Sequence, residues 1–307
     1  MPRRPQHIRV LSDGRPGHET QSLGLAEAIA RRTGAQIHCV RFGPADLIWS
    51  RYRKTVADRA PVDLLLGAGH RTHLALCLAA KRLAARAVVI MKPTWPAWFF
   101  DLCLVPRHDL RAGASLSPRF VPTFGALNRL PEQLPPKQPT GLVLIGGPSR
   151  AHGWDAGPLL AAIREVLATR VELTWTVSDS RRTPNGFVDE LRAENLRAEF
   201  VSHRQTPPGW VAARLLAAEE AWVTADSVTM LFEAVTAGAR TGILPMPVRR
   251  ANAGPVRAVA DLAKAGFATA YASWREQGRR LPPPKRLHET GRCADIVLER
   301  LFPTPGA

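Results

Sequence analysis

IRVLSDGRPGHETQSLGLAEAIA, residues 8–30, places a short apolar strand, a glycine-containing turn and an apolar helix in direct succession. The strand is predicted at Ile8–Leu11, the turn at Asp13–Ser22 and the helix at Ser22–Arg32. Glycines in the turn allow sharp bends and a close backbone approach to a ligand, and the helix N-terminus favours phosphate or carboxylate. The same pattern also fits an ordinary strand–turn–helix corner. The catalytic residues predicted in this turn are His18 and Asp13, and the predicted ligand contacts are Gly14, Gly17 and Glu19.

The composition bounds the class of protein. A chain of 307 residues is long enough for two domains, and 45% hydrophobic residues fit a globular protein. The formal charge of +16 comes mostly from dispersed arginines. The arginine codons of a GC-rich genome are one explanation for part of this excess. Nucleic acid is the least favoured partner because no block of basic residues occurs.

Cysteine spacing and hydropathy predict the cellular compartment of the protein. The four cysteines form no C-x-x-C pair, which predicts neither a zinc site nor a disulfide framework and favours a reducing compartment. Only seven residues precede the first predicted strand, so we expect no signal peptide, and no apolar run is long enough to span a bilayer. The sequence therefore predicts a cytoplasmic protein that is soluble or peripheral on the inner face of the membrane.

Short apolar segments alternate with helix-length segments along most of the chain, which is typical of parallel α/β sheets. The proline-rich residues 131–139 interrupt this alternation and read as a linker. We therefore predict two Rossmann-like domains facing a cleft, residues 1–130 and 140–307, with a last helix at residues 287–301 that packs back on the first domain. Ligands of such sheets bind at the carboxyl ends of the strands.

A second candidate loop follows the predicted strand at residues 62–66. It reads Gly67-Ala-Gly-His-Arg-Thr-His73 and presents His70 as a ligand contact. No third ligand has suitable spacing for a metal, so no metal is expected. His70 also fits the role of a cap on the following helix.

The second half carries three candidate motifs, each directly after a predicted strand. The amides of Gly146, Gly147 and Ser149 are predicted to cradle a diphosphate. Another loop adds arginines that pair well with phosphate oxygens, and it also fits a solvated loop. Its candidate residues are Ser180, Arg181 and Arg182.

The third motif joins a helix start to a carboxylate. Asp226 or Ser227 is a natural N-cap, and Glu233 lies two helical turns after Asp226 on the same face. A carboxylate in that position is suited to bind both hydroxyls of a ribose. An exposed glutamate on an amphipathic helix is the alternative.

These motifs together resemble the mitochondrial-fission "elongated mitochondria" family, whose bacterial members are often labelled nucleoside-diphosphate-sugar epimerases. The resemblance runs through the motifs at residues 12–21, 67–73, 91–93, 146–149, 180–184 and 224–228, although Ala225 stands where the bacterial pattern has Glu. More distantly, the layout is similar to GT-B glycosyltransferases, including the lipid-linked N-acetylglucosamine transferase of peptidoglycan synthesis. That likeness implies ligand roles for Gly14, Gly17, His18, Gly147, Ser149 and Glu233.

Three functions remain open. The leading hypothesis is a metal-independent, GT-B-like glycosyltransferase that uses a nucleotide-diphosphate sugar as substrate, needs no cofactor and has His18 as general base. A sugar-nucleotide epimerase is the second; it would need a further acid or base such as Asp13, Glu19 or His70. A non-enzymatic membrane adaptor is the third, as the role of the plant relatives implies.

Aromatic and basic residues occur together at residues 49–54 and 92–100, which suits an anionic membrane surface or a lipid-linked acceptor. Core packing explains Phe99 and Phe100 equally well.

Overall fold

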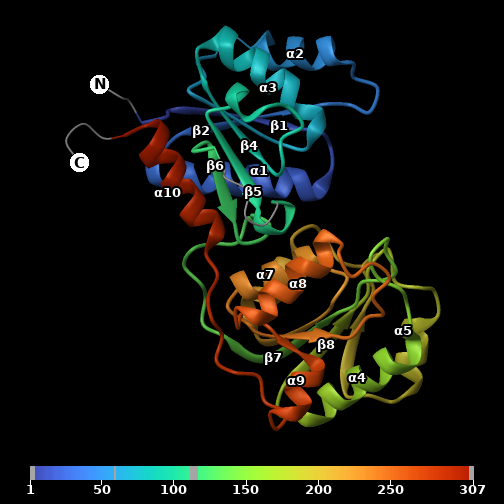
Figure 1. Cartoon of the computed structure of the whole chain (residues 1–307). Coiled ribbons are helices and arrows are strands. Elements are labelled where there is room, and N and C mark those ends of the chain that lie inside the picture. Colours follow the sequence, from blue (N-terminus) through green and yellow to red (C-terminus); the bar gives the residue numbers. More distant parts are fainter. Residues whose placement is uncertain (1–3, 59, 111–116, 304–307) are drawn as a thin grey trace. The chain divides into compact units, whose positions relative to one another are not determined.

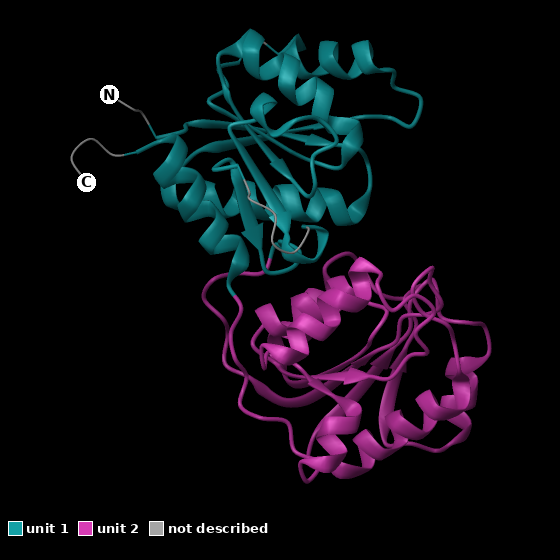
Figure 2. Ribbon diagram, viewed as in Figure 1, with its two compact units in different colours: residues 1–129, 288–307 teal, residues 130–287 magenta. Residues whose placement is uncertain are grey.

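The computed structural model describes residues 4–58, 60–110 and 117–303, and it divides the chain into two compact units (Figures 1 and 2). Unit 1 comprises residues 1–129 and 288–307, and unit 2 comprises residues 130–287. Each described unit contains a six-stranded parallel sheet. The α/β class and the two Rossmann-like sheets predicted from the alternating apolar segments are therefore present.

In unit 1 the strand order is β2-β1-β3-β4-β5-β6. The strands are β1 (His7–Ser12), β2 (Gln36–Arg41), β3 (Leu64–Ala68), β4 (Arg86–Ile90), β5 (Leu102–Pro106) and β6 (Phe120–Thr123). The helices are α1 (Pro16–Thr33), α2 (Ile48–Ala57), α3 (His70–Leu83) and α10 (Glu289–Leu301), with short 3-10 turns at Ala97–Phe99 and Arg107–Asp109.

In unit 2 the strand order is β12-β11-β10-β7-β8-β9. The strands are β7 (Gln138–Leu144), β8 (Thr174–Ser178), β9 (Ala198–Val201), β10 (Ala218–Thr224), β11 (Arg240–Leu244) and β12 (Thr269–Ala270). The helices are α4 (Ala156–Thr169), α5 (Phe187–Ala193), α6 (Trp210–Ala217), α7 (Val228–Thr236), α8 (Gly254–Lys264) and α9 (Tyr271–Glu276). The order reverses between β7 and β10, and such a switch point is where open α/β sheets bind ligands.

Helix α1 begins earlier than the sequence predicts. Pro16 is its first residue, so only Asp13, Gly14 and Arg15 form the connection from β1. Proline suits the first position because its fixed φ is helical and the amide it lacks would have no partner there. His18 therefore lies on the first turn of a helix rather than in a loop.

The last helix belongs to unit 1. Helix α10 packs on α1 (Figure 1), and its Cys293, Ala294 and Val297 lie in the same buried cluster as Leu25 and Ile29. The expected second domain therefore ends at residue 287 instead of 307.

The proline-rich stretch is part of unit 2 rather than a separate linker. Lys137 lies at its end, and its ammonium donates to the carbonyls of Leu215, Leu216 and Ala237 at 3.1, 3.0 and 2.7 Å. These carbonyls belong to the carboxyl-terminal ends of α6 and α7, where a cation is favourable. The prolines explain why residues 131–139 form no helix, whereas the hydrogen bonds of the Lys137 ammonium attach this stretch to unit 2.

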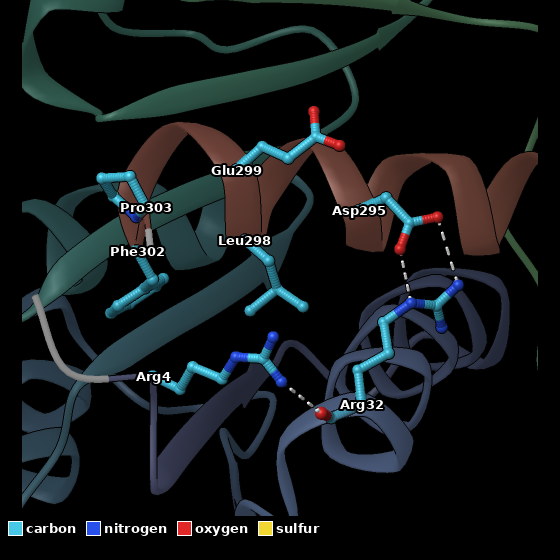
Figure 3. Close-up of a pocket in the computed structure, with 7 residues that line it drawn as sticks. All are labelled: Arg4, Arg32, Asp295, Leu298, Glu299, Phe302 and Pro303. Atoms are coloured by element: carbon cyan, nitrogen blue, oxygen red, sulfur yellow. Dashed lines mark hydrogen bonds and ion pairs between the residues drawn. The ribbon is translucent and has the colours of Figure 1, made fainter. Parts of the chain in front are cut away.

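A cavity of about 510 Å³ lies beside α10 in unit 1 (Figure 3). Arg32, near the end of α1, pairs there with Asp295 at 2.6 Å, and Arg4 donates to the Arg32 carbonyl. Fourteen residues of helix separate Arg32 from His18, which is roughly 20 Å at 1.5 Å per residue. This cavity is therefore remote from the residues that the sequence singles out.

Candidate functional site

Unit 1 carries an aspartate–histidine dyad at the carboxyl end of β1. The Asp13 side chain is fully buried, and its Oδ2 lies 3.0 Å from His18 Nδ1. A carboxylate only accepts hydrogen bonds, so Nδ1 donates and Nε2 carries the lone pair. The Asp13 Oδ1 atom accepts the Arg15 amide at 3.1 Å, which fixes the carboxylate. An oriented imidazole of this kind is suited to act as a general base.

The dyad requires glycine at the β3–α3 corner. Gly69 has a φ of +84°, and a Cβ there would overlap His18 Nδ1 and lie 3.0 Å from Asp13 Oδ2. The corner therefore contacts the dyad through a bare backbone. The sequence motif contains this glycine, but its role was not predicted, because its neighbours come from the β1–α1 connection and from α1.

We expect Gly69→Ala to displace His18 and to lower the free energy of unfolding by about 1–3 kcal/mol, because the side chain is both strained and in conflict with the imidazole. Thermal or urea unfolding measures this. Gly17→Ala is the matched control, since its Cβ meets nothing within 4 Å in α1 and alanine favours helix. Equal stability of the two variants would contradict this account of the corner.

The other predicted residues of the opening turn have different environments. Gly14 has a φ of +78° and donates its amide to Ser12 Oγ, whereas Gly17 lies exposed within α1. Glu19 is engaged inside the chain: it accepts from Ser12 Oγ at 2.5 Å and from Arg41 Nη2 at 2.8 Å. The Arg41 guanidinium lowers the pKa of Glu19 below its ordinary value. Glu19 is therefore an ion-paired carboxylate that supports the turn, not a free ligand contact.

The two histidines of the second loop also differ. His70 is exposed at the start of α3 and has no hydrogen-bond partner among the described residues. His73 is fully buried, and its Nδ1 lies 2.8 Å from Thr94 Oγ1 and accepts the Thr94 amide at 3.2 Å. Burial lowers the pKa of His73 to about 4, so it is a neutral anchor for the segment after β4.

In unit 2, the loops after β7, β8 and β10 contact one another. The Gly146 amide donates to Thr224 Oγ1 at 2.7 Å, and the Gly147 amide donates to Asp226 Oδ2 at 3.1 Å. The Ser149 amide donates to the His152 carbonyl at 2.9 Å. The prediction that these three amides form an open diphosphate cradle is corrected by these bonds, because each N–H already has an acceptor in the chain.

Arg182 closes this loop cluster. Its Nη2 lies 2.6 Å from Asp226 Oδ2 and 3.3 Å from Ser227 Oγ, and its Nη1 donates to the Gly147 carbonyl. A Cβ on Gly147 would overlap the Arg182 backbone, and one on Gly146 would overlap Asp226 and Ser227. The two glycines therefore allow close packing between loops. Part of the Arg182 side chain, 43%, still reaches solvent.

Ser180 is joined to this loop cluster through Thr183, whereas Arg181 is not part of it. The Ser180 amide donates to Thr183 Oγ1, whose hydroxyl donates to the carbonyl of Gly146. Arg181 is exposed, has no partner among the described residues, and lines a cavity of about 380 Å³ with His203. The two adjacent arginines therefore lie in different environments, one in the loop cluster and one at a cavity, which the sequence motif does not reveal.

Glu233 is half-buried on α7. Its carboxyl group has no hydrogen-bond or ion-pair partner among the described residues. Burial raises the pKa of Glu233 to about 7. A desolvated carboxyl group without a partner inside the chain is ready to accept hydrogen bonds from a ligand.

Sequence reasoning missed Thr183, Thr224 and His152 in unit 2. All three complete the loop cluster. Thr224 is the last residue of β10, and Thr183 and His152 lie in the loops after β8 and β7, so a place at the carboxyl end of a strand was the available signal. Within the described ranges, no group of three or more histidine, cysteine, aspartate or glutamate side chains is arranged to hold a metal ion.

A family model, "Mitochondrial fission ELM1", matches residues 16–301. The chain belongs to the mitochondrial fission ELM1 family. This match confirms the resemblance read from the motifs and covers both units.

The ELM1-family chain is also similar to individual proteins. It is 25% identical over 292 residues to the uncharacterized protein RP120 of Rickettsia prowazekii (strain Madrid E), covering 76% of this chain and 81% of that protein. The UDP-GlcNAc 2-epimerase from Methanocaldococcus jannaschii has a TM-score of 0.60 at 12% identity, over 96% of this chain and 99% of that one. MurG of Acinetobacter baumannii has a TM-score of 0.53 at 13% identity, over 96% and 100%. The fold is therefore the GT-B-like fold of these enzymes.

Proposed function

We propose that this ELM1-family chain is a glycosyltransferase that uses a nucleotide-diphosphate sugar. The observation that carries the proposal is the Asp13–His18 dyad, because the activation of an acceptor hydroxyl needs a fixed imidazole whose Nε2, as here, has no partner among the described residues. Unit 1 would bind the acceptor and unit 2 the nucleotide, with Glu233 on the ribose hydroxyls. The likeness to enzymes of UDP-GlcNAc supports a nucleotide-sugar ligand through the shared fold.

In the proposed reaction, His18 Nε2 takes the proton of the acceptor hydroxyl while the acceptor oxygen attacks the anomeric carbon. The bond from that carbon to the diphosphate oxygen breaks, and its electron pair leaves with the nucleoside diphosphate. Asp13 stabilises the imidazolium that forms. We propose that arginines stabilise the negative charge of the leaving diphosphate; one of them, Arg181, has no acidic partner among the described residues. We therefore expect neither a metal nor a cofactor.

A thermal-shift panel of UDP-, GDP-, ADP- and CMP-sugars tests this proposal. One nucleotide should stabilise the protein, and incubation of that sugar nucleotide with candidate acceptors should release the nucleoside diphosphate. Absence of any shift would contradict the proposal and favour the adaptor. Conversion to a second sugar nucleotide without an acceptor would establish an epimerase instead, the activity of the M. jannaschii neighbour.

We also propose that unit 1 acts at an anionic membrane surface. The segment after β4 exposes Trp95, Trp98 and Phe99 by 42, 72 and 36%, and Lys81 lies 5.8 Å from the Phe99 ring centre. Aromatic rings beside cations suit a lipid headgroup region. None of the helices in the described ranges has the length and hydropathy to cross a bilayer.

We expect the double variant Trp98→Ala, Phe99→Ser to lose most binding to vesicles that contain anionic lipid, because it removes the most exposed aromatic side chain of this segment and the ring beside Lys81. Vesicle co-sedimentation measures the bound fraction, which high salt should also lower. Val171→Ser, at an exposed apolar residue of unit 2, is the control. Equal binding of the double variant and the wild type would contradict the membrane proposal.

A further inference from the structure

Two buried polar atoms in unit 2 lack partners within the described chain. They are Asp226 Oδ1 and His152 Nδ1. The Asp226 side chain is fully buried, and His152 is 1% exposed. Leaving a buried polar group unpaired costs stability, so two such atoms in one loop cluster point to a ligand that pairs with them.

Both atoms lie at the switch point of the sheet. His152 is in the loop after β7, and Asp226 is in the loop after β10, the two strands between which the chain order reverses. Asp226 and Arg182 are the charges that act on the imidazole: the aspartate raises and the arginine lowers its pKa. Burial has the largest effect and lowers the pKa of His152, which keeps the ring neutral at neutral pH.

The backbone holds His152 on both sides. The Ser149 hydroxyl accepts the amides of Ala151 and His152 at 3.2 and 3.0 Å. The Gly153 amide donates to the Pro247 carbonyl at 2.7 Å. His152 therefore sits in a built position, and its unpaired nitrogen is not the result of a loose loop.

The hydrogen-bonding capacity of Asp226 Oδ1 and His152 Nδ1 indicates which chemical group of a ligand they bind. A carboxylate oxygen accepts a hydrogen bond and repels a phosphate oxygen. A neutral imidazole nitrogen either donates or accepts. Hydroxyl groups satisfy both, because each O–H can donate to Asp226 and its oxygen can accept from His152. The internal bonds of the Gly146 and Gly147 amides agree, since they leave no phosphate cradle at this point.

We propose that His152 and Asp226 bind hydroxyl groups of the sugar carried by the nucleotide, so that this cluster selects the sugar rather than the diphosphate. The inference rests on the proposed function. It makes His152 a specificity residue of the donor site, separate from the dyad on unit 1 and from Glu233 on the ribose.

Calorimetry with two ligands tests the inference: the nucleotide sugar that stabilises the wild type, and its sugar-free nucleoside diphosphate. His152→Leu should weaken the nucleotide sugar about tenfold and leave the nucleoside diphosphate within about twofold, as expected for one lost hydrogen bond. His152→Asn should restore most of the affinity, because its amide occupies the place of Nδ1.

Three outcomes would overturn the inference. Equal weakening of both ligands by His152→Leu would assign His152 to the diphosphate or to the fold, and unchanged affinity for both would remove it from the site. A wild type that binds neither ligand would refute the proposed function itself, and this inference with it.

Discussion

Replacement of His18 by asparagine should lower kcat for release of the nucleoside diphosphate by about 10²–10⁴-fold, the usual contribution of a general base. Asparagine has no basic nitrogen to take the acceptor proton, although it keeps a polar group beside Asp13. The affinity of the variant for the nucleotide should change little, because we propose that the nucleotide binds to unit 2. Steady-state turnover and calorimetry on the same preparation separate the two effects.

Two further variants define the role of the dyad. Asp13→Asn should also lower kcat, because an amide no longer orients the imidazole and no longer stabilises its charged form. His38→Asn is the matched control, since this histidine is 58% exposed on β2 and pairs with Asp58. Retained turnover in His18→Asn would remove His18 from the mechanism.

Glu233→Gln should weaken nucleotide binding by about 10–100-fold, the loss expected for hydrogen bonds to a charged acceptor. In the wild type, affinity should rise as the pH increases through about 7, because the pKa of Glu233 lies there and the ionised form accepts better. The variant should lose this dependence. Calorimetric titrations from pH 5.5 to 8.5 measure both effects.

The same carboxyl group predicts how the stability of the ligand-free protein depends on pH. Its pKa is raised from 4.5 to about 7 by folding, so between these values the folded state binds more protons than the unfolded state. Its contribution to stability is therefore present at low pH and is lost as the pH rises through 7, by up to about 3 kcal/mol. Glu233→Gln should be more stable than the wild type at pH 8 and similar at pH 4.5. The reverse order at pH 8 would show that Glu233 has a stabilising partner.

The alternation of short apolar and amphipathic segments was sufficient to predict both sheets, because parallel strands are buried on both faces and are therefore locally recognisable. It did not predict the helices α2 and α9 or the edge strands β6 and β12. It also placed residues 131–139 in a linker. Proline content predicts that a segment forms neither helix nor central strand, but it does not predict which part of the protein the segment packs against.

The positions of the candidate site residues were also predictable from the sequence, because each lies in a loop or helix that follows a strand. Asp226 lies in the loop after β10, His18 on the first turn of α1 and Glu233 on α7. The hydrogen bonds between these loops could not be predicted from the sequence. Gly147 and Asp226 lie 79 residues apart, and no local pattern encodes their hydrogen bond.

The sequence by itself thus determined the α/β class, the strand–loop–helix units and the residue types at the carboxyl ends of the strands, all of which depend on local patterns along the chain. Only the tertiary structure decided which of those groups remain available to a ligand. It pairs Glu19 with Arg41, uses the glycine amides internally, and leaves Glu233, His152 Nδ1 and Asp226 Oδ1 without partners in the described chain. The physical reason is that a hydrogen bond between loops depends on the three-dimensional register of distant strands, which is set only when the whole sheet has formed.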